Sequence, residues 1–277
     1  MPRNPPPVPS CSVCDGRGYR VSKDGEVARA LICDCVGSCK DCRGTGWVAI
    51  DRSTLSRMRQ CECQELEHRV RLFNFTRIPG RHANSTRLPS SFSPSRLLMP
   101  AMTAAAKFLK DFKKGQDSRG LIFHGDVGRG KTHLVVAILR ELTLDRSISC
   151  KFVEFSHLLA DLKTGFDLGT PAVQLLEPLV QVDVLAIDEL GKGRNTEWEA
   201  TIIDELVSRR YNSGKVILAT TNYPPGPPTG VASGNLATGE LVALSDRVGT
   251  RIYSRLREMC HFCAVSGDDY REKAAGR

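Results

Sequence analysis

The order of hydrophobic and polar residues predicts alternating strands and helices from residue 101 onward. Short apolar runs lie at 120–124, 151–155, 182–190 and 215–221. Longer mixed segments with helical spacing lie at 101–114, 131–142, 156–166 and 196–211. Apolar runs of this length are typical of strands buried on both faces, and here they alternate with helices. The pattern therefore predicts a doubly wound α/β fold with a parallel sheet.

The N-terminal part of the chain shows a different pattern, which is an internal repeat of cysteines. The unit reads C-x2-C-x-G-x-G-aromatic, then a basic stretch, then C-x-C. Each cysteine of the first unit has a counterpart in the second at one constant offset along the chain. The repeat predicts two copies of one small module. Its cysteines are Cys11, Cys14, Cys33 and Cys35 in the first unit and Cys39, Cys42, Cys61 and Cys63 in the second.

These patterns predict a domain organisation. The expected segments are a tail (1–10), the cysteine module (11–63), a basic linker (64–100), the α/β domain (101–270) and a second tail (271–277). The linker holds six arginines and two acids, and its stretch 65–75 could form a short helix. A Pro- and Gly-rich insert at 223–241 interrupts the α/β domain and has no role that the sequence indicates.

Composition adds a charge and an expected compartment. With 277 residues, 41% of them hydrophobic, the chain has enough apolar material for a core. Its net charge of +8 favours an anionic partner, most commonly nucleic acid, although a soluble basic protein without such a partner can carry the same charge. No apolar run is long enough to span a membrane and no signal-peptide pattern is present, so we expect a cytoplasmic protein with no membrane partner. Cysteines in that compartment bind metal or lie buried more often than they form disulfides.

A glycine-rich segment has the pattern of a phosphate-binding loop. GDVGRGKT fits G-x4-G-K-[ST] and lies between a predicted strand and a predicted helix, which makes a chance glycine-rich turn the weaker interpretation. Such a loop points backbone N–H groups at phosphates, and the helix N-terminus adds partial positive charge. We expect ATP here, with Lys131 at the β- and γ-phosphates and the Thr132 hydroxyl on Mg²⁺. The expected nucleotide-binding residues are Gly125, Asp126, Val127, Gly128, Arg129, Gly130, Lys131, Thr132 and His133.

Two acids, Asp188 and Glu189, follow the apolar run VLAI. Doubly wound sheets bind ligands at the carboxyl ends of their strands. Packing alone does not explain acids at this position, because unpaired carboxylates are costly to bury; two exposed loop acids are the alternative. We expect Asp188 to hold Mg²⁺ through water and Glu189 to activate the attacking water.

Two further elements are candidates for catalysis. The next strand ends at Asn222, whose side chain could orient the water against the γ-phosphate; a simple turn is the alternative. Arg247, Arg251 and Arg255 share one face of a predicted helix. A solvated arginine face is the ordinary interpretation of such spacing. However, an arginine given to a neighbouring subunit's γ-phosphate would neutralise transition-state charge, with Arg255 the first candidate and Arg251 the second.

The cysteine module has the composition of a metal site. Four thiolates per unit is the number in a closed structural zinc site, so we expect two Zn²⁺ ions, one in each unit, although pairing crossed between the units is open. A redox role requires an isolated C-x-x-C beside a thioredoxin-like pattern, and none is present. The metal should supply folding free energy, because the module is too small for a sizeable core. For Cys260 and Cys263, which form one more C-x-x-C, we expect burial over a third metal site, and Cys150 is expected in the core.

Residues 76–270 resemble the DnaC-like and IstB-like branch of the AAA+ ATPases, the bacterial and phage helicase loaders and transposition helpers. The segments that carry the resemblance are RIPGRHANSTRL, GDVGRGKTHL, FVEFSHLLADLKTGF, VDVLAIDELG, TEWEATIIDELVSRRYNSGKVILATTNYPP and LSDRVGTRIYSRLREM. The resemblance implies ATP hydrolysis, binding of single-stranded DNA and head-to-tail homo-oligomers. It places Asn222 at the sensor position and Arg255 at the arginine finger, and it implies little or no C-terminal lid. The cysteine module is similar to the C-x2-C-x-G-x-G zinc repeats of DnaJ-type chaperones, but it has two units where those have four.

The sequence therefore predicts an ATP-dependent loader of a replicative helicase that binds single-stranded DNA and uses the zinc module to recognise its partner protein. The alternative is an IstB-like helper of a transposase that acts on duplex DNA. A third interpretation, a protein-binding adaptor that holds ATP only as a structural ligand, is disfavoured by the intact set of Lys131, Asp188 and Glu189.

Overall fold

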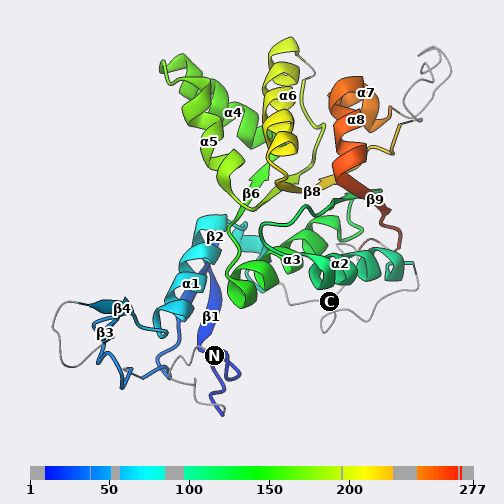
Figure 1. Ribbon diagram of the computed structural model, residues 1–277. Helices are drawn as coiled ribbons and strands as arrows, with labels where there is room; N and C mark the ends of the chain where they lie inside the picture. The colour runs from blue at the N-terminus through cyan, green and yellow to red at the C-terminus, as the bar shows by residue number, and fades with distance from the viewer. Residues whose placement is uncertain are drawn as a thin grey trace. The chain divides into compact units, whose positions relative to one another are not determined.

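The computed structural model (Figure 1) divides into two compact units, Met1–Asn84 with Leu139–Ile148 and Ser85–Ile138 with Ser149–Arg277. It describes residues 10–37, 39–50, 57–84, 97–194, 196–226, 242–267 and 269. Both predicted tails, most of the Pro- and Gly-rich insert and the middle of the predicted linker lie outside the described residues, apart from residue 10 of the first tail.

The first unit contains two antiparallel hairpins, one in each cysteine repeat. Strand β1 (Tyr19–Asp24) pairs with β2 (Val27–Ile32), and β3 (Trp47–Ala49) pairs with β4 (Met58–Gln60). Helix α1 (Gln64–Thr76) and the short 3-10 helix η1 (Gly80–His82) follow. Each hairpin joins the C-x2-C of its repeat to the C-x-C.

Helix α1 packs on the first hairpin. Its Leu66, Val70 and Phe73 are buried, as are Ala28 and Ala30 of β2. The helix prediction for 65–75 is confirmed, but this segment is not a loose connection. Residues up to 84 belong with the cysteine repeats in one compact unit, so this unit extends beyond the expected boundary at 63.

The second unit is built on a five-stranded parallel sheet in the order β6-β7-β8-β5-β9. The strands are β5 (Gly120–His124), β6 (Cys150–Glu154), β7 (Val184–Asp188), β8 (Val216–Thr221) and β9 (Cys260–Ala264). The four apolar runs thus form strands as predicted, and the doubly wound α/β fold is confirmed. Central β7 and β8 are buried along their whole length because helices cover both faces of the sheet.

Figure 1 shows α2 and α3 on one face of this sheet and α4 to α8 on the other. The helices are α2 (Met99–Asp111), α3 (Lys131–Arg146), α4 (Phe155–Asp167), α5 (Ala172–Gln181), α6 (Glu197–Asn212), α7 (Leu244–Val248) and α8 (Thr250–Met259). Helix α5 was not anticipated from the sequence. The arginine-bearing segment also differs from expectation, because Gly249, with φ of 82°, divides it into two helices.

A buried arginine holds the base of the sheet together. The fully buried Arg210 of α6 donates to the carbonyl oxygens of Leu179 and Val182 at 2.6 and 3.1 Å, and to that of Val216 at 2.6 Å. Leu179 lies in the last turn of α5, Val182 lies just before β7, and Val216 is the first residue of β8. Burial lowers the pKa of Arg210 to about 10, so the side chain remains charged at neutral pH. No helix among the described residues is long and apolar enough to cross a membrane.

Candidate functional site

The glycine-rich loop lies where the sequence predicts it, between the end of β5 and the start of α3. Gly128 and Gly130 have φ of 79° and 89°, a backbone conformation that favours glycine. Lys131, the first residue of α3, is buried. Its Nζ donates to the carbonyl oxygens of Gly125 and Asp126 at 2.7 and 2.6 Å. The lysine is therefore folded over its own loop, with its ammonium group where the loop would meet phosphates.

Asp188 lies beside the loop, at the end of β7, and is 2% exposed. The Thr132 hydroxyl donates to its Oδ1 at 2.9 Å, and the Thr220 hydroxyl of β8 donates to the same oxygen at 2.5 Å. Thr132 and Asp188 supply the oxygen ligands that Mg²⁺ prefers. Sequence reasoning paired these two residues but missed Thr220. The sequence did predict that β8 ends in polar residues. It did not predict that β8 lies next to β7, which brings Thr220 to Asp188.

Glu189 follows in a left-handed backbone conformation, with φ of 57°. Its N–H donates to Thr220 Oγ1 at 2.9 Å, which fixes the turn out of β7. Its carboxylate is held by Lys192, whose Nζ lies 2.5 Å from Oε2. This hydrogen bond raises the pKa of Lys192. Non-glycine residues seldom adopt this conformation, and those that do are often found at functional sites.

The remaining predicted catalytic residues are more dispersed. Asn222 directly follows β8 and is exposed. Arg255 donates to Asp204 Oδ1 at 2.8 Å, and the Arg251 Nε lies 3.6 Å from the same oxygen. Arg251 is 74% exposed, whereas Arg255 is 23% exposed. Within one chain, therefore, α6 engages both arginines, and the nucleotide loop engages neither.

Arg247 has a different surrounding from the other two arginines. It lies in α7, before the break at Gly249, and its Nε donates to the Gly191 carbonyl at 2.9 Å. It also donates to the Gly193 carbonyl, and its guanidinium lies over the Tyr223 ring at 5.3 Å from the centroid. Arg247 thus holds the loop that follows Glu189, a structural role that the spacing of three arginines does not reveal.

The segment after β9 lies against the glycine-rich loop. The Val265 N–H donates to the His124 carbonyl at 2.8 Å, and Arg129 donates to the Gly267 carbonyl. A Cβ atom added to Gly128 would collide with the carboxylate of Asp269. An acidic side chain is therefore in contact with the loop that the sequence assigns to phosphate.

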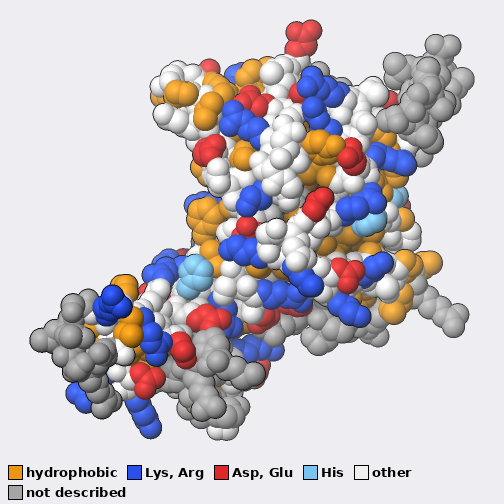
Figure 2. All heavy atoms as spheres, in the orientation of Figure 1, with side chains coloured by type: hydrophobic (Ala, Val, Ile, Leu, Met, Phe, Trp, Pro, Cys, Tyr) orange, Lys and Arg blue, Asp and Glu red, His pale blue; other side chains and the backbone are white. Residues whose placement is uncertain are grey.

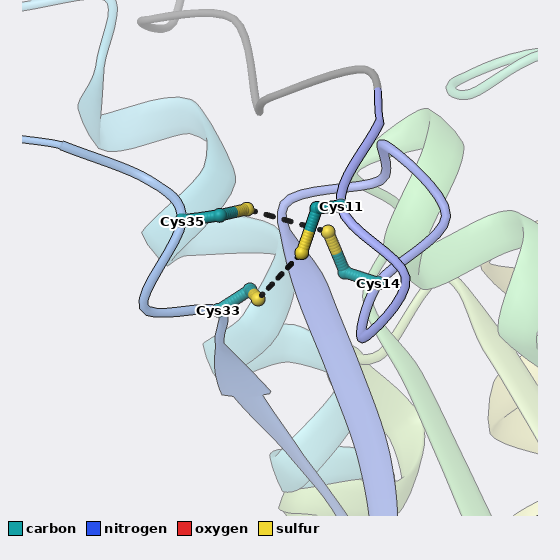
Figure 3. A group of neighbouring side chains, drawn as sticks. All are labelled: Cys11, Cys14, Cys33 and Cys35. Carbon is teal, nitrogen blue, oxygen red and sulfur yellow. Dashed lines mark hydrogen bonds between the residues drawn. The ribbon is translucent and has the colours of Figure 1, made fainter.

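The eight cysteines of the repeats form two clusters. The groups are Cys11, Cys14, Cys33 and Cys35, and Cys39, Cys42, Cys61 and Cys63, and the sulfur atoms of each group lie within 4.8 Å of one another. Figure 3 shows the four sulfur atoms of the first group turned toward one another from the two loops. All eight cysteines are free thiols. The grouping within each repeat unit is the one expected from the sequence.

The two clusters have the same local geometry. The sulfur distance from Cys11 to Cys33 is 3.8 Å and from Cys39 to Cys61 is 3.7 Å. The Gly18 N–H donates to Cys14 Sγ at 3.4 Å, from a backbone with φ of 78°. Glycine in this conformation brings its N–H to sulfur without a Cβ in the way.

One thiol of each cluster has a lowered pKa, whereas the pKa values of Cys61 and Cys63 are raised. Burial raises the pKa of Cys14, but hydrogen bonds from the Gly18 N–H and from Cys35 outweigh it and lower the pKa to about 7. Burial also raises the pKa of Cys42, but hydrogen bonds from the Gly46 N–H and from Cys63 outweigh it and lower the pKa to about 7. Each cluster therefore offers a thiolate near neutral pH, the form that binds metal. Four convergent thiols, no disulfide and one acidified thiol fit a closed tetrahedral Zn²⁺ site.

The other three cysteines do not gather into a site. Cys150 and Cys260 are buried, and burial raises the pKa of Cys260 to about 12. Cys260 and Cys263 lie in β9, and among the described residues no metal cluster includes them. Burial, the expected interpretation for Cys260, agrees with this placement, whereas Cys263 is only partly buried.

With the geometry known, comparison with known proteins gives the family. Residues 107–276 match the family described as IstB-like ATP binding protein. The chain belongs to this family. This IstB-like protein is 30% identical over 213 residues to the replicative helicase loader DnaC of Escherichia coli (strain K12), covering 75% of the chain and 77% of that protein. It is 26% identical over 285 residues to the uncharacterized protein YqaM of Bacillus subtilis (strain 168), covering 93% of the chain and 83% of that protein.

The fold of the IstB-like protein agrees with its sequence relatives. It is similar to the crystal structure of the DnaC helicase loader, with a TM-score of 0.56 and 26% identity over 67% of this chain and 99% of the other. The expected resemblance to DnaC-like and IstB-like AAA+ proteins is confirmed. The family match begins at residue 107, so it does not include the cysteine clusters.

Proposed function

We propose that this protein is an ATP-dependent helicase loader that binds single-stranded DNA and a replicative helicase and hydrolyses ATP at the glycine-rich loop. The observation that carries the proposal is the hydrogen bond of 2.9 Å between Thr132 and Asp188, which brings a magnesium-type ligand pair to the loop of an IstB-like ATP-binding domain. The relative named as a replicative helicase loader, at 30% identity, supports the choice of partner.

Each residue has a role in this proposal. The N–H groups of the loop and the Lys131 ammonium bind the phosphates. Thr132 and Asp188 hold Mg²⁺, which when bound neutralises phosphate charge. Glu189 accepts a proton from the attacking water, and Asn222 orients that water. Arg255 of a neighbouring copy reaches the γ-phosphate after leaving Asp204, which makes a homo-oligomer part of the active site.

We place the DNA contact in a groove between α4 and the loop that precedes α6. The groove has a volume of about 880 Å³ and is lined by Lys163, Lys192 and Arg194 together with Phe166 and Trp198. Phe166 and Trp198 meet edge to face, with ring centroids 5.8 Å apart. Cations that bind phosphates beside aromatic rings that stack on bases are the usual means of holding a single strand. Asp167 and Glu199 also line the groove, so the cations do not act alone.

The two cysteine clusters bind one Zn²⁺ each in this proposal and form the arm that recognises the partner protein. A closed four-thiolate site has no open position for a substrate, so the metal stabilises structure and does not catalyse. Residues Met1–Asn84 belong to one compact unit and the nucleotide loop belongs to the other, which suits an adaptor role.

The central experiment measures ATP turnover with and without oligothymidylate. Glu189→Gln should lower turnover by about 100-fold or more while ATP still binds, because the general base is lost. The matched control is Glu197→Gln, an exposed acid in the first turn of α6. Unchanged turnover in Glu189→Gln would leave the chain as an adaptor that holds ATP only as a structural ligand.

DNA binding has its own test, which is titration of a labelled oligothymidylate at several salt concentrations. Trp198→Ala should weaken binding by about tenfold through lost stacking, and Lys163→Ala should reduce the salt dependence by about one contact. Lys110→Ala, an exposed lysine of α2, is the control. A flat response to salt contradicts phosphate binding.

The second candidate function is an IstB-like helper of a transposase, which the family match supports. It uses the same nucleotide site but acts on duplex DNA. Preference for a hairpin duplex over oligothymidylate of equal length would select this candidate over the loader.

A further inference from the structure

The two hairpins of the cysteine module share one register over the residues that the structure describes in both, but they differ in what covers them. Tyr19 of the first hairpin corresponds to Trp47 of the second, and Ala30 corresponds to Met58, at the same offset that relates the cysteines. The strand pairing keeps this equivalence, because Val21 is opposite Ala30 and Ala49 is opposite Met58. The same face can therefore be compared in both copies.

In the first hairpin this face is covered by helix α1. Tyr19 is 6% exposed and Ala30 is fully buried. The Asn74 side chain of α1 bonds both backbone groups of Ala30, accepting from its N–H at 2.7 Å and donating to its carbonyl at 3.0 Å. A helix thus covers the apolar face and also binds the outer edge of β2.

In the second hairpin the equivalent face is exposed. Trp47 and Met58 are each 53% exposed, and Ala49 between them is exposed as well. The backbone of Met58 has the register position that Asn74 bonds in the first copy. Met58 is larger than Ala30, so a helix on this face would rest on the methionine and indole side chains rather than approach the strand closely.

The second cysteine repeat carries more exposed cations than acids. Among its described residues the exposed cations are Lys40, Arg43, Arg57 and Arg59, and the exposed acids are Asp41 and Glu62. Arg59 is opposite Val48, on the other face of the hairpin from Met58, and pairs with Glu62 at 3.7 Å. Figure 2 shows hydrophobic and basic side chains together where β3 and β4 lie. A helix that docks here is favoured when its own polar face is acidic.

We propose that the Trp47–Met58 face binds an acidic amphipathic helix of a partner protein, in the way that the first hairpin binds α1. The inference rests on the proposed role of the zinc module as the arm that recognises another protein. It names the surface and the chemistry of the segment bound. Trp and Met are well suited to such a site, because a large rigid ring and a flexible thioether adapt to a helix surface.

The test uses the full zinc-loaded chain and a fluorescein-labelled synthetic amphipathic helix with a Leu and Phe face and a Glu face. Anisotropy should show saturable binding, and Trp47→Ser with Met58→Ser should weaken it by roughly 30-fold. Leu31→Ser, on the uncovered face of β2, is the matched control and should change affinity less than about twofold. A helix with Lys in place of Glu, and one of shuffled order, should bind at least about tenfold more weakly.

Several results would overturn the proposal. These are absence of saturable binding up to about 1 mM, or equal binding by the double variant. Oligothymidylate that competes for the Trp47–Met58 face would make it a nucleic-acid site, and a monomer–dimer equilibrium lost in the double variant would make it a contact between copies. Zinc content and ATP turnover are measured on the same samples. Failure of peptide binding with both intact overturns this inference alone and leaves the proposed ATPase standing.

Discussion

The hydroxyl of Thr132 lies 2.9 Å from Oδ1 of Asp188 and joins the first turn of α3 to the last residue of β7. The bond spans 56 positions of sequence, so only the parallel sheet brings the two residues together. It holds both oxygens in place before any metal binds.

The first prediction concerns this pair. Thr132→Ala and Asp188→Asn should each lower Mg²⁺-dependent ATP turnover by about 100-fold or more, because the first removes a hydroxyl ligand and the second removes the negative charge of the carboxylate. The double variant should be little worse than either single one, since both act on one ion. Turnover is measured across a Mg²⁺ titration. The control is Thr201→Ala, at an exposed position of α6. Additive losses would contradict a shared ion.

The second prediction concerns Lys192, which bonds Glu189 at 2.5 Å and also lines the proposed DNA groove. A DNA phosphate that attracts Lys192 would free the Glu189 carboxylate to act on water. Lys192→Met should therefore raise ATP turnover without DNA and abolish its stimulation by oligothymidylate. Lys163→Met, in the same groove but without a bond to Glu189 in the structure, should weaken DNA binding and keep the stimulation at saturating DNA. Loss of stimulation in both variants would show that DNA affinity alone is responsible.

The third prediction separates two roles of Arg255. If it acts on the γ-phosphate of a neighbour, Arg255→Ala should lower turnover by roughly 1,000-fold while ATP binding by one chain is kept. Asp204→Ala removes its partner within the chain and should leave turnover nearly intact. If both variants lose activity and stability together, the ion pair of 2.8 Å is only structural. Thermal unfolding of both variants provides the control.

The fourth prediction concerns Asp269, whose carboxylate contacts Gly128. Negative charge at this loop opposes a triphosphate, so Asp269→Ala should tighten binding of ATP by severalfold, and more at low salt than at high salt. Fluorescent nucleotide titration measures the affinity for ATP, and Asp161→Ala, an exposed acid of α4, is the control. Weaker binding in Asp269→Ala would show that the carboxylate supports the loop instead.

The sequence predicted this site to the extent that its signals are local. The loop at 125–132 and the acids at 188 and 189 follow directly from apolar runs that end in polar residues. Thr220 was missed because strand order is not written in any one segment, and β8 lies next to β7 only through the folded sheet. The single helix predicted for the three arginines was too long. The helical spacing of the sequence continues across Gly249, but the positive φ of this glycine ends α7 and separates it from α8.

The cysteine repeats illustrate the same limit. The constant offset between the two copies predicts two equal clusters, and the structure brings both together. That only the first hairpin is covered by α1 was not visible in the sequence. The helix follows the second repeat in the chain but packs on the first, and this is a tertiary preference for the small Ala28 and Ala30.

The last prediction uses thiol reactivity to test the metal assignment. The chain has eleven cysteines, eight of them in the two clusters. With Zn²⁺ bound, a thiol reagent at mildly alkaline pH should modify at most Cys263, because Cys150 and Cys260 are buried and burial raises the pKa of both. Chelation should expose the eight cluster thiols, which mass spectrometry assigns by residue. Zn²⁺ should bind more weakly as the pH falls, and this dependence should steepen below about 7, where the thiols of Cys14 and Cys42 also hold protons that metal binding must displace. Rapid modification of the cluster thiols before chelation would contradict the assignment of zinc to the two clusters.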